Sequence, residues 1–138
     1  MTPTRKGALR MDSRSETNLA QVHPDLAKVM RLAAPASKVP FIVIHGLRSA
    51  AEEAAMVAKG ASTTLHSRHL ASTDGLARVV DVMADPAGAA DWRPVDYQAI
   101  AAAVFAAAHS AGTPVEWGGA WTTFKDWGHF QLPWSIYP

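Results

Sequence analysis

Two segments that lie far apart in the chain each carry side chains of the kind that bind metal ions, and the fold must bring them together if they act jointly. His69 is followed by Asp81, which interrupts a run of valines. The second segment holds Asp126 and His129 among several tryptophans. Two imidazoles and one carboxylate form the ligand set of a catalytic zinc site whose fourth position stays open for water. This set predicts hydrolysis by a metal-activated water.

The composition limits the class of protein. A chain of 138 residues is expected to form a single domain, and its 49% hydrophobic and 18% charged residues are typical of a compact soluble protein. The formal net charge is only +1, so we predict no nucleic-acid partner. We separately expect the protein to be a monomer. Because the chain has no cysteine, a bound metal must be held by nitrogen and oxygen.

No targeting segment is visible in the sequence. The chain is polar through Asn18, and its longest apolar run, residues 99–108, is too short and too rich in alanine to cross a bilayer. We therefore expect synthesis in the cytoplasm, with residues 1–17 as a flexible N-terminal lead and residues 18–138 as one domain. A substrate outside the membrane would require another protein to open the way.

The pattern of apolar residues, caps and turn formers predicts three helices and four short strands. Pro24, the Ser49–Glu52 capping box and Gly112 mark helix ends. The helices are expected at about 24–35, 49–60 and 96–111, and the strands at 39–45, 79–83, 115–117 and 128–132. This order favours an α+β domain in which about three helices pack against a small, mostly antiparallel sheet.

Each candidate ligand also has a structural interpretation. Taken alone, Asp81 is better explained as an outward-facing residue of an amphipathic strand, and His129 as a hydrogen-bonded core histidine. Asp126 lies three residues before His129, where it can sit beside a metal-bound water as a general base. The alternative is a turn residue paired with Lys125 or with a backbone amide, and the spacing does not choose between the two.

Further polar and aromatic residues are candidates for contacts with substrate. Arg48 follows the strand at 39–45, and its planar guanidinium suits a carbonyl or a carboxylate, although a solvated loop charge is the usual case. His66 is a second imidazole near the first ligand, and Trp121 belongs to an aromatic cluster that can line a groove for a peptide. Three other histidines are interpreted as structural: His23, His45 and His109.

The chain resembles the zinc peptidases that include the vancomycin-resistance D,D-peptidases and the phage L-alanyl-D-glutamate endolysins, and the resemblance is closest to the small phage endolysins. It rests on six pieces that occur in order: residues 46–49, 60–62, 67–70, 80–82, 117–119 and 126–131. The resemblance covers nearly the whole chain and implies the hedgehog/D,D-peptidase-like fold.

By this resemblance, Zn²⁺ is bound by His69, Asp81 and His129. Asp126 would then be the general base, and Arg48 would stabilise the developing oxyanion. Ser67 would support the first ligand or contact the substrate through a hydrogen bond. The set of candidate substrate-binding residues then has four members: Ser67, His66, Trp121 and Gln131.

The resemblance implies a zinc-dependent peptidoglycan endopeptidase, an endolysin that hydrolyses a stem-peptide amide between L-alanine and D-glutamate. Such an enzyme acts on the cell wall after a holin-like pore has permeabilised the membrane. A D,D-carboxypeptidase or dipeptidase on the same scaffold is the first alternative. The second is a wall-peptide binding module without catalysis, although the presence of Asp126 and Arg48 speaks against it.

Three departures from the family pattern affect the fit of substrate more than the metal. The first two ligands are separated by a longer loop than is common, and this makes Asp74 a rival ligand, which we rank below the strand residue Asp81. Ala120 stands where relatives often carry aspartate. Trp127 and Gly128 stand directly before His129, where relatives more often carry a segment that contains proline.

Overall fold

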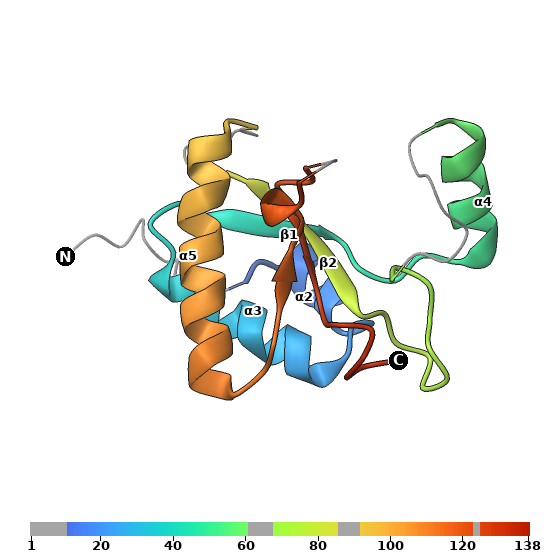
Figure 1. The fold of residues 1–138 in the computed structure, drawn as a ribbon, viewed down its shortest axis with the longest axis horizontal. Coiled ribbons are helices and arrows are strands. Elements are labelled where there is room, and N and C mark those ends of the chain that lie inside the picture. The colour runs from blue at the N-terminus through green and yellow to red at the C-terminus, as the bar shows by residue number, and fades with distance from the viewer. Residues whose placement is uncertain (1–10, 61–67, 86–91, 123–124) are drawn as a thin grey trace.

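The structure, a computed structural model, describes residues 11–60, 68–85, 92–122 and 125–138 (Figure 1). The helices in these residues are α2 (Ser13–Leu19), α3 (Pro24–Ala36), α4 (Ala50–Ala58) and α5 (Pro94–Ala111). The strands are β1 (Phe41–His45), β2 (Val79–Ala84), β3 (Glu116–Trp117) and β4 (His129–Gln131), and a short 3-10 helix, η2, spans Gly118–Ala120. The predicted α+β class is confirmed.

The four strands form one sheet in the order β1-β2-β4-β3, and all neighbouring strands are antiparallel. One face of the sheet is apolar. Val80 lies opposite Phe130, Val82 lies opposite Val43, and all four are buried. Helices α3 and α5 pack against each other beside the sheet (Figure 1). Their largest buried side chains complete the core: Leu26, Val29, Met30, Tyr97, Ile100 and Val104.

The helix ends follow local signals. The predicted capping box is present, because the hydroxyl of Ser49 accepts from the backbone N–H of Glu52 and the Glu52 carboxylate accepts from the N–H of Ser49. Gly112 caps α5 in the left-handed conformation, with φ 68°. Pro35 does not stop α3 but lies in its last turn. All three predicted helices are confirmed, with small shifts at their ends.

Helix α2 begins inside the segment that we expected to be a flexible lead. Among its residues Ser15 and Leu19 are buried, and the helix packs on β1. The hydroxyl of Ser15 accepts a hydrogen bond from the backbone N–H of Val43 at 2.8 Å. A buried serine carries no apolar signal, so the sequence pattern did not reveal this contact. The ordered fold therefore starts before residue 18, and residues 1–10 lie outside the described part.

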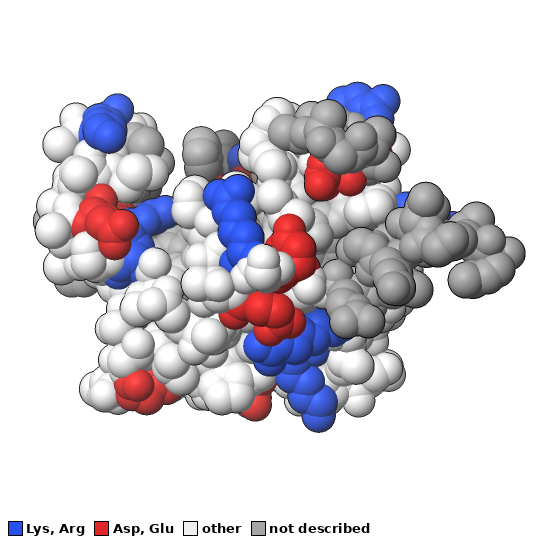
Figure 2. Space-filling model, turned by 180° about the vertical axis from the view of Figure 1, so that it is seen from behind, with Lys and Arg blue, Asp and Glu red and all other residues white. Residues whose placement is uncertain are grey.

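The outer parts of the molecule are mixed in charge. Helix α4 stands apart from the sheet (Figure 1), and its buried side chain is that of Glu53. On the face seen in Figure 2, acidic and basic side chains lie close to one another between broad uncharged areas. None of the described helices combines the length and the hydropathy that a bilayer crossing needs.

Candidate metal centre

The second face of the sheet carries a group of polar side chains, and two of the candidate ligands belong to this group. Asp81 in β2 lies opposite His129 in β4 and opposite His45 in β1. Directly opposed residues of antiparallel strands point to the same face, so these three side chains gather at one place. The alternation that buries Val80 and Val82 turns Asp81 to this second face.

His69 reaches the same place from the loop before β2. Its Nδ1 lies 2.7 Å from the backbone oxygen of Gly46, which can only accept, so Nδ1 carries the proton of the neutral ring. The unprotonated Nε2 then faces Asp81 Oδ2 at 3.0 Å. The loop is fixed in turn, because the carbonyl of His69 accepts from the backbone N–H of Arg48 at 2.7 Å. His69 therefore presents a lone pair to the carboxylate of Asp81.

His129 presents its other ring nitrogen. Its Nε2 lies 2.6 Å from Gln131 Oε1, and the Gln131 amide nitrogen donates to Glu116 Oε1 at 3.0 Å. Nδ1 of His129 faces Asp81 Oδ1 at 3.5 Å and Asp126 Oδ2 at 3.6 Å. The segment lies close to η2, since a Cβ on Gly118 would overlap the backbone oxygen of Asp126. Glycine at position 118 therefore lets Asp126 and His129 approach Asp81.

The cluster His69, Asp81 and His129 fits a divalent cation. One ligand atom from each residue lies within 4.8 Å of the other two. Ligand bonds of about 2.0–2.2 Å in a tetrahedron place neighbouring ligand atoms roughly 3.4 Å apart. The ring nitrogens of His69 and His129 lie 3.0 and 3.5 Å from the two oxygens of the Asp81 carboxylate, Oδ2 and Oδ1 respectively, so each ring is at about this distance from the carboxylate. Oδ1 of Asp81 is also buried without a hydrogen bond in the described residues, as a ligand oxygen would be.

The charges at the cluster are strongly coupled. Burial raises the pKa of Asp81, but interactions with the rings of His129, His45 and His69 outweigh it, so the net pKa lies well below its usual range. Burial lowers the pKa of His129, while Asp81, Gln131 and Asp126 raise it to a value above the usual one. Asp81 is therefore held as a carboxylate, the form that binds a metal.

Asp126 stands at the edge of the cluster with its side chain 44% exposed. Burial raises its pKa above that of an ordinary aspartate, and the negative charge of Asp81 raises it further, although His129 and His69 act in the opposite direction. A carboxylate with a raised pKa is a stronger base. Asp126 therefore stands where a base would take a proton from a water at the cluster.

His45, which we interpreted as structural, faces the site, and that interpretation is corrected. A register shift between Val43 and His45 adds Ile44 as an extra residue in β1, so His45 rather than Ile44 lies opposite Asp81. Such bulges re-aim side chains. Nδ1 of His45 lies 3.6 Å from Asp81 Oδ2, and the side chain is 55% exposed. Sequence periodicity could not reveal this position, because it assumes an unbroken alternation.

Arg48 has a partner that the sequence did not suggest. Its Nη1 donates to Glu53 Oε1 at 2.6 Å, and the two side chains are 14% and 1% exposed. The guanidinium lines a hollow of about 610 Å³ between the start of α4 and the loop after His69. Among the described residues, this hollow shares no lining residue with the pocket beside Asp126.

The remaining predicted residues have different places. The ring of Trp121 lies 5.0 Å from the ring of His129, centroid to centroid. Gln131 is 8% exposed, behind His129 and bonded to it. Asp74 accepts from the Arg78 guanidinium at 3.0 Å and does not belong to the cluster. His66 and Ser67 lie outside the described residues.

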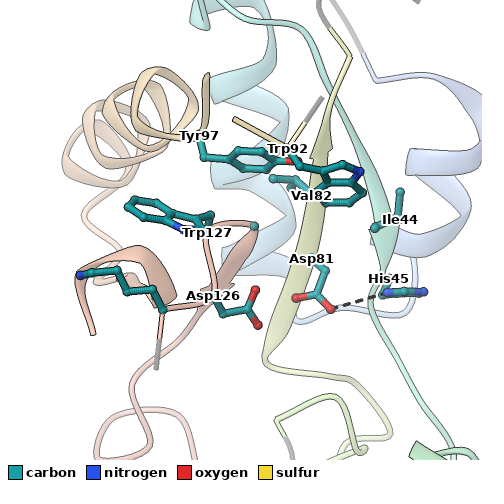
Figure 3. A pocket seen from close by; sticks show the side chains of 10 residues that line it. Ile44, His45, Asp81, Val82, Trp92, Tyr97, Asp126 and Trp127 are labelled. Atoms are coloured by element: carbon teal, nitrogen blue, oxygen red, sulfur yellow. Dashed lines mark ion pairs between the residues drawn. The ribbon is translucent and has the colours of Figure 1, made fainter. Parts of the chain in front are cut away.

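A pocket of about 380 Å³ opens directly beside the cluster (Figure 3). Asp81, His45 and Asp126 point into one end of it, and aromatic rings line the other end. Its apolar walls come from five residues: Ile44, Val82, Trp92, Tyr97 and Trp127. A concave apolar space with a few converging polar groups is the form that substrate sites take.

Comparison with known proteins agrees with this geometry. The family described as phage L-alanyl-D-glutamate peptidase matches residues 8–129, which include the whole cluster. An L-alanyl-D-glutamate peptidase of Escherichia phage T5 is 27% identical over 134 residues, 94% of this chain and 93% of the relative. The crystal structure of the Serratia marcescens L-Ala D-Glu endopeptidase ChiX is similar with a TM-score of 0.85 at 50% identity, covering 95% of both chains. The chain thus belongs to the phage L-alanyl-D-glutamate peptidase family.

Proposed function

We propose that this protein is a zinc-dependent peptidoglycan endopeptidase that hydrolyses the amide between L-alanine and D-glutamate in stem peptides. The observation that carries the proposal is the position of Asp126, with Oδ2 3.6 Å from a nitrogen of His129 at the edge of the His-Asp-His cluster. A general base beside three metal ligands is the arrangement of a hydrolase that activates water. Membership of the peptidase family supports the same bond.

Zinc is the metal that suits this ligand set best. Two neutral imidazoles and one carboxylate are a common catalytic zinc set, and three protein ligands leave one position open. Bound zinc lowers the pKa of a coordinated water from about 15.7 to about 7. Both rings are held with the required nitrogen unprotonated, one by Gly46 and the other by Gln131. In each neutral ring, these contacts therefore favour the tautomer that a metal needs.

Three other side chains have separate roles in the proposed reaction. Asp126 accepts the proton of the attacking water and then donates it to the nitrogen of the leaving D-glutamate. Trp121, beside the ring of His129, forms one wall for the peptide. Arg48 stays our candidate for stabilising the oxyanion on the family resemblance alone, since its guanidinium lines a different hollow from the pocket beside Asp126. Its Nη1 is held by Glu53, and a guanidinium has five N–H donors in a fixed plane.

We also propose that the protein acts as a monomer and meets its substrate in the cell wall after a holin-like pore has opened the membrane. One chain contributes all three ligands and Asp126, so a second copy is not required to complete the site. The supporting comparison is the phage peptidase family to which the chain belongs.

The bond can be identified from the products. We expect digestion of defined muropeptides to yield fragments with a new N-terminal D-glutamate and a new C-terminal L-alanine, detected by mass spectrometry after N-terminal labelling. Release of free D-alanine would instead favour a D,D-carboxypeptidase. Tight binding of muropeptides without any turnover would favour a non-catalytic wall-binding module.

The pocket beside the cluster is our candidate for the cleft that holds the substrate, and His45 tests it. We expect His45→Ala to raise KM about 10- to 100-fold, with a smaller change in kcat, because one hydrogen bond to a charged group contributes roughly 1.5–3 kcal/mol. Steady-state kinetics on a stem peptide measure both constants. His109→Ala, the same change on the exposed end of α5, is the control and should leave both unchanged. An unchanged KM in His45→Ala would exclude this use of the pocket.

A further inference from the structure

We propose that Gln131 and Glu116 are positioning residues that fix the ring of His129 for metal binding. Glu116 orients the amide of Gln131, and the amide oxygen then holds the N–H at Nε2 of His129. The ring is thereby left with its lone pair on Nδ1, which faces Asp81. This inference rests on the proposed metal site, and it gives Gln131 a role different from the substrate contact that the family resemblance implied.

The three residues are brought into line by the sheet. Glu116 in β3 lies opposite Gln131 in β4, so their side chains are neighbours on one face. His129 is two residues before Gln131 on the same strand and therefore points to that face as well. The contacts are 3.0 Å between Glu116 and Gln131 and 2.6 Å between Gln131 and His129.

Glu116, at the end of the hydrogen-bond chain farthest from His129, determines the direction in which these hydrogen bonds run. An ionised carboxylate only accepts, so the nitrogen of the Gln131 amide must face Glu116. The amide oxygen must then face His129, and it accepts only if Nε2 carries the proton. Because a neutral imidazole has one N–H, Nδ1 is left as the ligand atom. A residue that lies on the surface strand β3 thus selects the tautomer of a metal ligand.

The two rings of the cluster are oriented by different means. His69 is oriented by the backbone oxygen of Gly46, a contact that no side-chain replacement removes. Within the described residues, Nε2 of His129 is held by the Gln131 side chain. Gln131 is only 8% exposed, so water does not readily take over this hydrogen bond. Outer partners of this kind change metal affinity by about 10–100-fold when they are replaced.

The test measures zinc affinity of the full-length protein by competition with a chromophoric chelator, so it does not depend on activity. We expect Gln131→Met, which keeps the length of the side chain but loses the amide, to weaken binding about 10–100-fold. Glu116→Ala should weaken it less, and the double variant should bind no worse than Gln131→Met, because Glu116 acts only through Gln131. Gln98→Met on the exposed side of α5 is the matched control, with unchanged affinity expected.

A second readout follows the tautomer itself. Long-range ¹H–¹⁵N spectra of the zinc-free protein should show that the neutral ring of His129 carries its proton on Nε2, and should show a mixture of the two neutral tautomers in Gln131→Met. Zinc affinity that is unchanged in Gln131→Met would overturn the proposal, as would a double variant that loses the product of the two single effects. Both results would leave the metal site standing, whereas a parent protein that binds no zinc would overturn the site and the positioning role together.

Discussion

Asp126→Asn is expected to remove nearly all hydrolysis while zinc binding is retained. The amide of asparagine has nearly the shape of the carboxylate but cannot accept the proton of the attacking water. Loss of a positioned general base costs about 10²–10⁴-fold in rate. The side chain is partly exposed and is not a member of the ligand cluster, so the fold and the three ligands should remain in place. The measurement is kcat on a stem peptide, with zinc content determined on the same sample.

Asp74→Asn is the matched control for this substitution. Asp74 is also a loop aspartate, but its carboxylate bonds to Arg78 and to the backbone N–H of Leu76, away from the cluster. Its replacement should leave kcat unchanged. If Asp126→Asn turned over substrate at the parent rate, Asp126 would not be the base. If it lost zinc together with activity, Asp126 would be a metal ligand instead.

The parts of the fold that could be predicted are those with local causes. Ser49 and Glu52, three residues apart, predict the start of α4. Gly112 predicts the end of α5, where it adopts the left-handed conformation. Val80 and Val82 alternate with Asp81, which identifies β2 and the face on which the aspartate lies. These features depend on residues within one turn or one strand, and the sequence contains all of them.

The parts that could not be predicted depend on contacts across the fold. The place of His45 depends on a bulge in β1, which shifts the register against β2 and has no marker in the sequence. Glu53 follows the capping residue Glu52 in a helix otherwise rich in alanine, and only the fold turns it inward to bind Arg48. Gln131 could be associated with the site, but its connection to Glu116 exists only because β3 pairs with β4.

The ligand cluster lies between these two cases. Neither Asp81 nor His129 could be identified as a ligand from its own surroundings, since a strand aspartate and a core histidine are the commoner interpretations. The ordered pieces of the family pattern favoured the three residues together. The antiparallel pairing of β2 and β4 then gives the physical reason, because it sets Asp81 directly opposite His129. The rival Asp74 is bound to Arg78 in the loop.

Removal of the metal should abolish activity, and His69→Ala should make the loss permanent. Dialysis of the parent protein against excess chelator is expected to reduce hydrolysis to background, and added Zn²⁺ should restore it. In His69→Ala the two remaining ligands should not hold zinc at micromolar concentration, so added metal should restore nothing. A protein that keeps its full lytic activity in excess chelator would contradict the metal mechanism.

Thermal unfolding measures the same site without substrate. A ligand that binds only the folded state stabilises it by about 4 kcal/mol at a concentration of 1,000 times Kd, so zinc should raise the Tm of the parent protein by about 10 °C or more. His69→Ala should show no zinc-dependent shift, whereas His109→Ala on α5 should keep the shift of the parent. Protons compete with the metal for the rings, and the pKa of His129 is raised, mainly by Asp81 against the effect of burial. The zinc-dependent shift should therefore shrink as the pH falls through that raised pKa, and it should be largest above it, where both imidazoles are neutral.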